Sequence, residues 1–320
     1  MSFDVFLQLF VQGVITGCVY AVAALGFVLI YKSSRVINLA HGYLIALGGF
    51  SVYTLYNLFH GWLRSSSSPF LSFIPAAIGG LIISYFAGLL IERIFLRPMV
   101  GEPIISVIMI TIGLGSLLDG LLHLTPFGSG NFSFDPPLFA SSSIQIGSIS
   151  ISPNQLLGVA IAIIFLFGFT YFFRRSTLGI AMRAVADDQL ASQSVGVSVE
   201  KVFAVAWAAA GLTTAAAGFT VGAISGLTID NFEGIGLKVL PVVILGGLDS
   251  IEGAIVGGII VGLLENLAAG FLDGFVPGGG TSEVIPFVML IAVLMVKPYG
   301  LFGTKEIERV CSFVRKGAAS

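Results

Sequence analysis

Charged residues are scarce in this 320-residue chain, where Asp, Glu, Lys and Arg together make up only 10%. A soluble domain carries roughly 25% charged residues, so a water-soluble globular protein is excluded. Hydrophobic residues make up 56%, the mean hydropathy is +1.01, and apolar runs recur along nearly the whole length. The composition therefore predicts an integral membrane protein without a separate soluble domain.

Cysteine and histidine are also rare, and familiar catalytic motifs are absent. The two cysteines, Cys18 and Cys311, are separated by the topology predicted below, so we expect no disulfide. Three scattered histidines do not make a metal site. The sequence has no G-x-x-x-x-G-K-[ST], H-E-x-x-H or G-x-S-x-G run, so we expect neither an enzyme nor a bound cofactor. A net charge of −2 argues against a nucleic-acid partner.

Eight apolar segments are each close to the ~20 residues that a spanning helix needs. They cover residues 6–31, 36–58, 70–91, 104–124, 154–173, 202–223, 251–272 and 283–297. A ninth, 236–249 (GLKVLPVVILGGLD), is short and contains Pro241, so it is either a short crossing or a re-entrant element. The sequence predicts an all-α, polytopic membrane helical bundle of about 8–9 spanning segments that forms a single transmembrane domain.

The positions of Lys and Arg orient this bundle. If the N-terminus is outside and 236–249 crosses, every Lys and Arg except Arg64 and Lys238 lies at the cytoplasmic side, as the positive-inside rule requires. Without that crossing the basic C-terminal tail (298–320) would lie outside, so we favour a crossing. Residues 125–153 then form an external loop, and 174–201 form a polar cytoplasmic segment.

The stretch RVINLAHGYLIALGG places polar side chains inside an apolar run, where they are costly and usually face protein or water. Asn38 and His41 are three residues apart and share a face of the predicted helix, with Gly42 beside them. They could line a translocation path, hydrogen-bond a neighbouring backbone or cap a broken helix. Because Arg35 lies at the cytoplasmic surface, we place them one to two turns inside, which favours bracing or a role near the inner exit.

Rows of small residues occur in the first predicted helix and in 251–272, and a second pair of polar residues lies in the later segments. Gly13, Gly17 and Ala21 recur every fourth residue, as do Gly253 with Gly257 and Gly258 with Gly262; such rows let helices pack closely in lipid. Glu265 follows Gly262 by three residues and points into protein. We predict that it pairs with Lys238 as a structural ion pair that fixes the hairpin between these segments.

The cytoplasmic segment 174–201 has the pattern of a short amphipathic helix, although a solvated loop is the alternative. Its apolar spacing is set by Ala181, Ala184, Val185 and Leu190. Arg183, Asp187 and Asp188 lie away from this stripe, and Gly196 ends the element. A short helix held under a membrane bundle suits docking to a cytoplasmic partner.

Five stretches, in order and over nearly the whole chain, together resemble a known family. They are GCVYAVAALGFVLIYKSSRVINLAHGYLIALGG, ERIFLRPMVGEP with ITIGLG, STLGIAMRAVADDQLASQSVGV, VILGGLDSIEGAIVGGIIVGLLEN, and KPYGLFG. The chain resembles the LivH-type permeases, membrane subunits of ATP-binding-cassette importers for branched-chain amino acids. The resemblance implies that 174–201 docks onto a separate ATPase subunit. The matching coupling residues are Gly179, Arg183, Ala184, Asp187, Asp188, Ala191 and Gly196, and the motif of the second helix falls on Asn38, Ala40, His41 and Gly42.

The resemblance also implies partners and a location. These are a second, LivM-type permease subunit, two cytoplasmic ATPase subunits that bind the ATP, an external substrate-binding protein, and the lipid of the bacterial inner membrane. Branched-chain or other small hydrophobic amino acids are the expected substrates, and urea or short amides are the alternative. A stand-alone channel or secondary carrier would use ionisable residues near mid-membrane; only Asp119, Glu265 and His41 qualify, the first two toward the outer side.

Overall fold

The computed structural model describes residues 3–62, 69–135, 138, 143–276 and 279–303, and it confirms the all-α bundle. Six of the described helices are long and apolar enough to cross a membrane: Phe3–Ser34, Leu71–Met99, Ile105–His123, Pro153–Arg175, Val199–Ser225 and Ile251–Leu272. The α-helices are α1 (Phe3–Ser34), α2 (His41–Trp62), α3 (Pro69–Ile91), α4 (Ile104–His123), α5 (Pro153–Arg175), α6 (Thr177–Asp187), α7 (Gln189–Ser194), α8 (Val199–Ser225), α9 (Ile229–Gly246), α10 (Ile251–Leu272) and α11 (Thr281–Val296). A π-helical turn (Glu92–Leu96), two short 3₁₀ turns (Arg97–Met99 and Pro126–Ser129) and the strands β1 (Ile144–Ile146) and β2 (Ile149–Ile151) complete the described elements.

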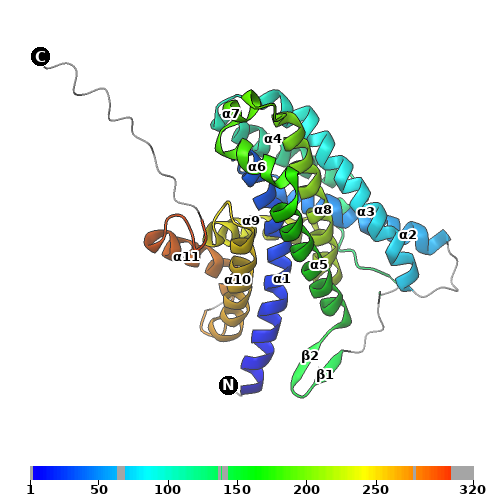
Figure 1. The fold of residues 1–320 in the computed structure, drawn as a ribbon. Coiled ribbons are helices and arrows are strands. Elements are labelled where there is room, and N and C mark those ends of the chain that lie inside the picture. Colours follow the sequence, from blue (N-terminus) through cyan, green and yellow to red (C-terminus); the bar gives the residue numbers. More distant parts are fainter. Residues whose placement is uncertain (1–2, 63–68, 136–137, 139–142, 277–278, 304–320) are drawn as a thin grey trace, which may run out of the picture.

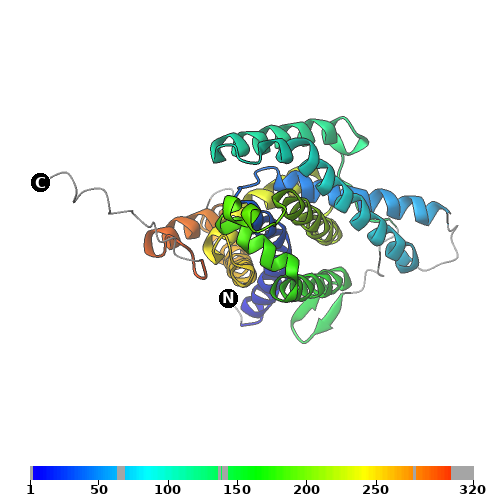
Figure 2. The same cartoon turned by 45° about the horizontal axis from the view of Figure 1, so that its top comes forward.

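Helices α1 and α8 form the buried centre of the bundle, and the other spanning helices surround them (Figures 1 and 2). The packing repeats between the two halves of the chain: α1 packs along α10 as α8 packs along α3, and α2 meets α9. Because α1 and α8 run in opposite directions (Figure 1), the halves form an inverted repeat. In transporters with this architecture the functional sites lie where the repeats meet.

The two ends of the bundle carry different structures. The antiparallel β1–β2 hairpin, in which Ile144 pairs with Ile151, lies at the end with the N-terminus, whereas α6 and α7 lie at the opposite end (Figure 1). Because α6 and α7 belong to the basic segment 174–201, we call their end cytoplasmic, following the positive-inside rule.

Helix α9 joins these two ends. Leu227, just before it, pairs with Phe132 of the predicted external loop. Just beyond it, Asp249 accepts a hydrogen bond from Lys32 at the far end of α1 (2.8 Å). Residues 236–249 are thus the second half of a longer helix and its following turn, with Pro241 accommodated inside the helix. This placement supports the interpretation that residues 236–249 cross the membrane rather than re-enter it.

Glycines bring the backbones of α1 and α10 together. A Cβ atom added to Gly262 would lie 2.4 Å from the Gly17 nitrogen, and one added to Gly17 would lie 2.6 Å from the Ile259 Cα. Neither position has room for a side chain, which is the close packing that small-residue rows allow in lipid. The row of Gly13, Gly17 and Ala21 and the row of Gly258 and Gly262 therefore form one interface, which fixes α10 against the central helix. The third row, Gly253 and Gly257, packs against α9 instead.

The second helix begins at His41, so the predicted start at residue 36 is wrong. The hydroxyls of Ser33 and Ser34 both donate to the Ile30 carbonyl at 2.8 Å, a bond that competes with helix continuation. Arg35 then takes a left-handed backbone conformation with φ of +56°, which is unusual for a residue other than glycine. Residues 35–40 therefore form a non-helical connection between α1 and α2.

Candidate functional site

The predicted cytoplasmic segment folds as two short helices, α6 and α7, that are fastened to the end of α5. Ser176 caps α6 by accepting a hydrogen bond from the Gly179 amide (3.0 Å). Gly179 lies so close to α5 that an added Cβ would meet the Phe173 carbonyl oxygen at 2.3 Å. Arg183 donates to that same carbonyl (3.1 Å). The segment is thus a positioned helical element, and the alternative of a solvated loop is wrong.

The buried stripe of α6 agrees with the predicted one only at Val185. It consists of Gly179, Met182 and Val185, whereas Ala184 is exposed. The sequence pattern counted alanines as apolar anchors, but the longer Met182 fills the space beneath the helix. The side chain of Leu190 lies outside the described residues.

One face of α6 is exposed and partly apolar. Ile180, Ala184 and Asp187 are spaced four and three residues apart, so they share this face, and Ile180 is 56% exposed. We call these three residues the coupling surface. Asp188 caps α7 by accepting from the Ala191 amide (2.9 Å).

Gly196 ends this element, as predicted. Helix α7 stops at Ser194, and Gly196 follows with φ of +89°. This backbone conformation is open to glycine but strained for other residues. The chain then turns into α8, whose first turn is capped by Ser198.

Arg35 connects α6 to the non-helical segment 35–40. Its guanidinium lies 3.6 Å from the Asp187 carboxylate and donates to the Ala186 carbonyl (3.3 Å). Both partners belong to the last turn of α6. Arg35, whose left-handed backbone conformation ends α1, therefore joins the last turn of α6 to the start of this segment.

Asn38 and His41 lie in different surroundings, and they do not share a helix face as predicted. Asn38 belongs to the non-helical segment, where its Oδ1 accepts from the Ala40 amide (3.1 Å). His41 is the first residue of α2, and its Nε2 bonds the Ala23 carbonyl at 2.8 Å. The predicted backbone bonding of these side chains at a helix break is therefore present.

This contact also corrects their depth. Ala23 precedes the end of α1 at Ser34 by 11 residues, or about 16 Å at ~1.5 Å per residue. The predicted depth of one to two turns was too shallow, because it assumed that α2 starts at the cytoplasmic surface. Segment 35–40 instead rises beside α1, so that α2 begins near the middle of the bundle.

Gly42 of α2 packs directly against α9. A Cβ added to Gly236 would lie 2.4 Å from the Gly42 Cα, and one added to Gly42 would lie 3.3 Å from the Glu233 Cα. Beside this contact is a cavity of about 300 Å³, which we call the central cavity. It is lined by Asn38, Leu39, Gly42, Tyr43, Ile112, Gly115, Ser116, Glu233, Gly236, Leu237 and Leu240.

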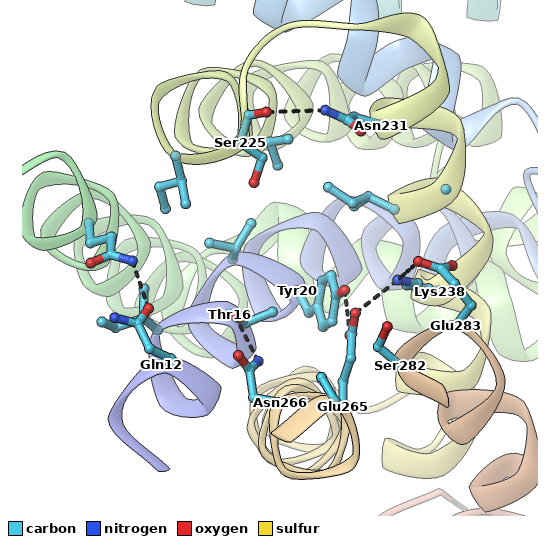
Figure 3. A pocket seen from close by; sticks show the side chains of 18 of the residues that line it. Gln12, Thr16, Tyr20, Ser225, Asn231, Lys238, Glu265, Asn266, Ser282 and Glu283 are labelled. Carbon is cyan, nitrogen blue, oxygen red and sulfur yellow. Dashed lines mark hydrogen bonds and ion pairs between the residues drawn. The ribbon is translucent and has the colours of Figure 1, made fainter. Parts of the chain in front are cut away.

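A larger, more polar cavity of about 430 Å³ lies toward the external end, and we call it the outer cavity (Figure 3). Lys238 reaches into it and contacts two carboxylates, Glu265 at 2.8 Å and Glu283 at 3.0 Å. The Tyr20 hydroxyl donates to the second oxygen of Glu265 (2.6 Å). The side chains predicted as an ion pair therefore belong to a network of four residues from α1, α9, α10 and α11.

Neutral polar side chains form the rest of the outer cavity wall. Gln155 donates to Gln12 (2.7 Å), and Asn266 donates to Thr16 (3.1 Å), joining α5 and α10 to α1. Figure 3 shows Gln12, Thr16 and Asn266 around the same space as the Lys238 network. The cavity is hydrophilic on several sides, which suits water or a polar solute.

Sequence reasoning missed Tyr20 and Glu233. The sequence did not indicate a functional role for Tyr20, because a tyrosine in an apolar run is usually interpreted as a packing residue. Glu233 fell outside the segment assigned as 236–249, although a helix start was visible: Thr228 caps α9 by accepting from the Asn231 amide (3.2 Å), a pairing typical of helix N-termini. Among the described residues, no group of three or more His, Cys, Asp or Glu side chains could hold a metal ion.

Comparison with known proteins places this architecture in a family. Residues 9–294 match the family described as branched-chain amino acid transport system / permease component. The chain is 30% identical over 315 residues to the high-affinity branched-chain amino acid transport system permease protein LivH of Salmonella typhimurium, with 97% of this chain and 99% of that protein covered. It is 29% identical over 318 residues to the corresponding BraD protein of Pseudomonas aeruginosa, with 95% and 98% covered.

A more distant relative has a different substrate in its name. The guanosine ABC transporter permease protein NupP of Bacillus subtilis is 28% identical over 245 residues, covering 71% of this chain and 64% of that protein. The resemblance seen in the sequence motifs is confirmed, and with it the membrane location. The chain belongs to the branched-chain amino acid transport system permease family and fits a membrane permease subunit of an ABC importer.

Proposed function

We propose that this chain forms half of the translocation path of an importer for branched-chain amino acids. The support for this substrate is the near-full-length likeness to permeases whose names specify branched-chain amino acids. The central cavity is lined by Leu39, Ile112, Leu237 and Leu240 as well as by polar groups, which suits an aliphatic side chain. The transport system includes an ATPase and a substrate-binding protein.

The finer assembly is also part of this proposal. A second, LivM-type permease covers the open side of the central cavity, where Leu39, Ile112 and Leu237 are exposed. Two ATPase subunits bind the ATP at the cytoplasmic end. The binding protein delivers substrate to the external end, close to the outer cavity. Neither ATP nor another cofactor is held by this chain.

Coupling runs through α6. The observation that carries this step is the pair of contacts that Arg35 makes with Asp187 and Ala186. An ATPase seated on the coupling surface (Ile180, Ala184 and Asp187) displaces α6, and Arg35 transmits the displacement to segment 35–40. This segment forms a wall of the central cavity through Asn38 and Leu39. The ATPase can bias the path only by binding its two conformations with different affinity.

The substrate assignment is tested by uptake in the native host. Deleting the gene for this chain removes high-affinity uptake of labelled leucine, isoleucine and valine, and a plasmid copy restores it. Excess unlabelled guanosine, urea or acetamide leaves leucine uptake unchanged in the wild type. Normal leucine uptake in the deletion strain, together with loss of guanosine or urea uptake, would assign the transporter to the other substrate class.

A further inference from the structure

One residue that lines the central cavity has a buried hydrogen-bond donor without a partner among the described residues. Asn38 is only 1% exposed, and its Oδ1 is occupied by the Ala40 amide. Its Nδ2 has no hydrogen-bond partner among the described residues, although the residue lines the cavity. A buried donor left unpaired is unfavourable and calls for an explanation. An acceptor on a ligand that reaches this donor from the cavity would satisfy it.

The N-terminus of α2 adds further donors at the same place. The first backbone hydrogen bond of α2 runs from Leu44 to the Ala40 carbonyl (3.2 Å). The amides of His41, Gly42 and Tyr43 precede it and lack a partner within the helix. The start of a helix also carries partial positive charge. Because α2 has 22 residues and begins in the interior of the bundle, its N-terminus and Asn38 form a site suited to a carboxylate.

The segment before α2 is held in place by α4. The buried Thr111 hydroxyl accepts from the Leu39 amide (3.4 Å) and lies 3.3 Å from the Ile37 carbonyl, while its shortest hydrogen bond goes to the Ile108 carbonyl of α4 (2.8 Å). His41 is fixed separately by its bond to Ala23. The donors are therefore positioned by neighbouring helices before any ligand arrives, which lowers the entropic cost of binding.

The facing wall of the cavity, on α9, supplies acceptors. Glu233 is exposed toward the cavity and interacts with the Tyr43 phenol. The Leu237 carbonyl, one helical turn beyond Glu233, lacks its usual hydrogen bond within the helix, because Pro241 has no N–H group to donate. The two walls are adjacent, since a Cβ on Gly42 would lie 3.3 Å from the Glu233 Cα. Donors on one wall and a carboxylate on the other are the partners that the carboxylate and ammonium groups of one α-amino acid need.

We propose that the central cavity binds the main-chain groups of the transported amino acid. Its α-carboxylate accepts hydrogen bonds from Asn38 Nδ2 and the first amides of α2, and its ammonium group pairs with Glu233. The aliphatic side chain lies against Leu39, Ile112 and Leu240. This inference rests on the proposed function, because its ligand is the amino acid that the importer carries.

The test measures direct binding to the assembled transporter, without its substrate-binding protein. The complex of this chain with its partner permease and ATPase subunits is placed in lipid nanodiscs, and ligand contact is followed by saturation-transfer NMR. Leucine is compared with isoamylamine, which lacks the carboxylate, and with isocaproate, which lacks the ammonium group. We expect leucine to bind at least tenfold more tightly than either analogue.

Two variants separate the roles of the walls. Asn38→Asp replaces the donor with a carboxylate and weakens leucine binding at least tenfold, while isoamylamine binding does not weaken. Glu233→Gln, at an exposed side chain, weakens leucine binding at least tenfold and lets isocaproate bind more tightly. Glu283→Gln makes the same chemical change in the outer cavity and leaves leucine binding within twofold.

The result that overturns the inference is equally direct. If leucine does not bind the wild-type complex, or if isoamylamine binds as tightly, the cavity does not recognise the carboxylate. Loss of leucine binding in Glu283→Gln but not in Glu233→Gln would move the site to the outer cavity. These results leave the proposed function intact as long as cells still import leucine through this chain, whereas failure of that uptake refutes the substrate itself.

Discussion

The interface between α1 and α10 sets the geometry of the outer cavity, and Gly262→Ala tests it. Both helices contribute cavity side chains, among them Tyr20 and Glu265. The added Cβ would lie 2.4 Å from the Gly17 nitrogen and 2.7 Å from the Gly13 carbonyl oxygen. Ordinary contact begins at 3.4 Å, so the helices must separate by about 1 Å to admit one methyl group.

That separation has an estimable cost. A gap of ~0.5–1 Å forfeits a quarter to a half of the dispersion energy of the atoms along it, and overpacking a close-packed site typically costs about 1–3 kcal/mol. The unfolding equilibrium should therefore shift by roughly 5- to 150-fold toward the unfolded state. The expected consequence is a protein that inserts in the membrane but unfolds at lower denaturant concentration.

The assay is unfolding of the purified chain in mixed micelles by added dodecyl sulfate. Gly168→Ala is the matched control, because a Cβ at Gly168 meets nothing within 4 Å and alanine favours the helix. We expect Gly262→Ala to lose stability and Gly168→Ala to keep or gain it. Equal stability of the two variants would refute the conclusion that these glycines are required by contact between backbones.

Three further perturbations address the polar sites. Lys238→Met leaves the Glu265 carboxylate, which is only 12% exposed, without its cation and should destabilise the protein by about 3–5 kcal/mol. Adding Glu265→Gln should recover most of this stability, and no recovery in the micelle assay would contradict an ion-pair role. His41→Ala removes the bond to Ala23 and should lower turnover and assembly without changing substrate preference, so an altered leucine-to-valine uptake ratio would disprove bracing. The Thr281 hydroxyl and amide, which donate to Asp273, lower the pKa of that carboxyl. A lowered pKa stabilises the fold above the unfolded value and the effect is lost as pH falls, so the protection of amides against hydrogen exchange at the start of α11, relative to the unfolded chain at the same pH, should fall only below about pH 3.9. Protection that falls at pH 6 would contradict this reasoning.

The sequence was sufficient to predict the all-α membrane bundle, because hydrophobic segments long enough to span a bilayer are a strong signal. It also placed Lys238 and Glu265 on neighbouring elements, since charged residues inside apolar helices need partners. Gly196 was recognisable as a helix end for the ordinary reason that glycine tolerates positive φ.

The break between α1 and α2 could not be predicted in the same way. Helices very commonly end at a left-handed residue that is usually glycine, but here Arg35 takes that conformation, and its side chain contacts α6, which is distant in sequence. Once the start of α2 was misplaced, Asn38 was assigned to a helix face and both polar residues were placed too close to the cytoplasmic surface. Long-range contacts of this kind are outside the reach of a local pattern.

The sequence predicted only part of the outer cavity, for a related reason. Lys238 was matched to one carboxylate, although Glu283 of α11 also approaches it at 3.0 Å. The order in which helices surround one another decides such contacts, and small-residue rows show that helices pack closely without showing which ones. The packing of α11 against α9 and α10 supplied the missing carboxylate.

ATP-driven uptake by the reconstituted transporter tests the central claim most directly. Proteoliposomes containing this chain, its partner permease and the ATPase subunits, with binding protein outside and ATP at the ATPase face, should accumulate labelled leucine. Ala184→Glu at the coupling surface should abolish accumulation while the permease pair still assembles, and Gly168→Ala should leave it unchanged. Leucine accumulation by this chain alone, without ATPase subunits, or undiminished uptake by Ala184→Glu would contradict the account.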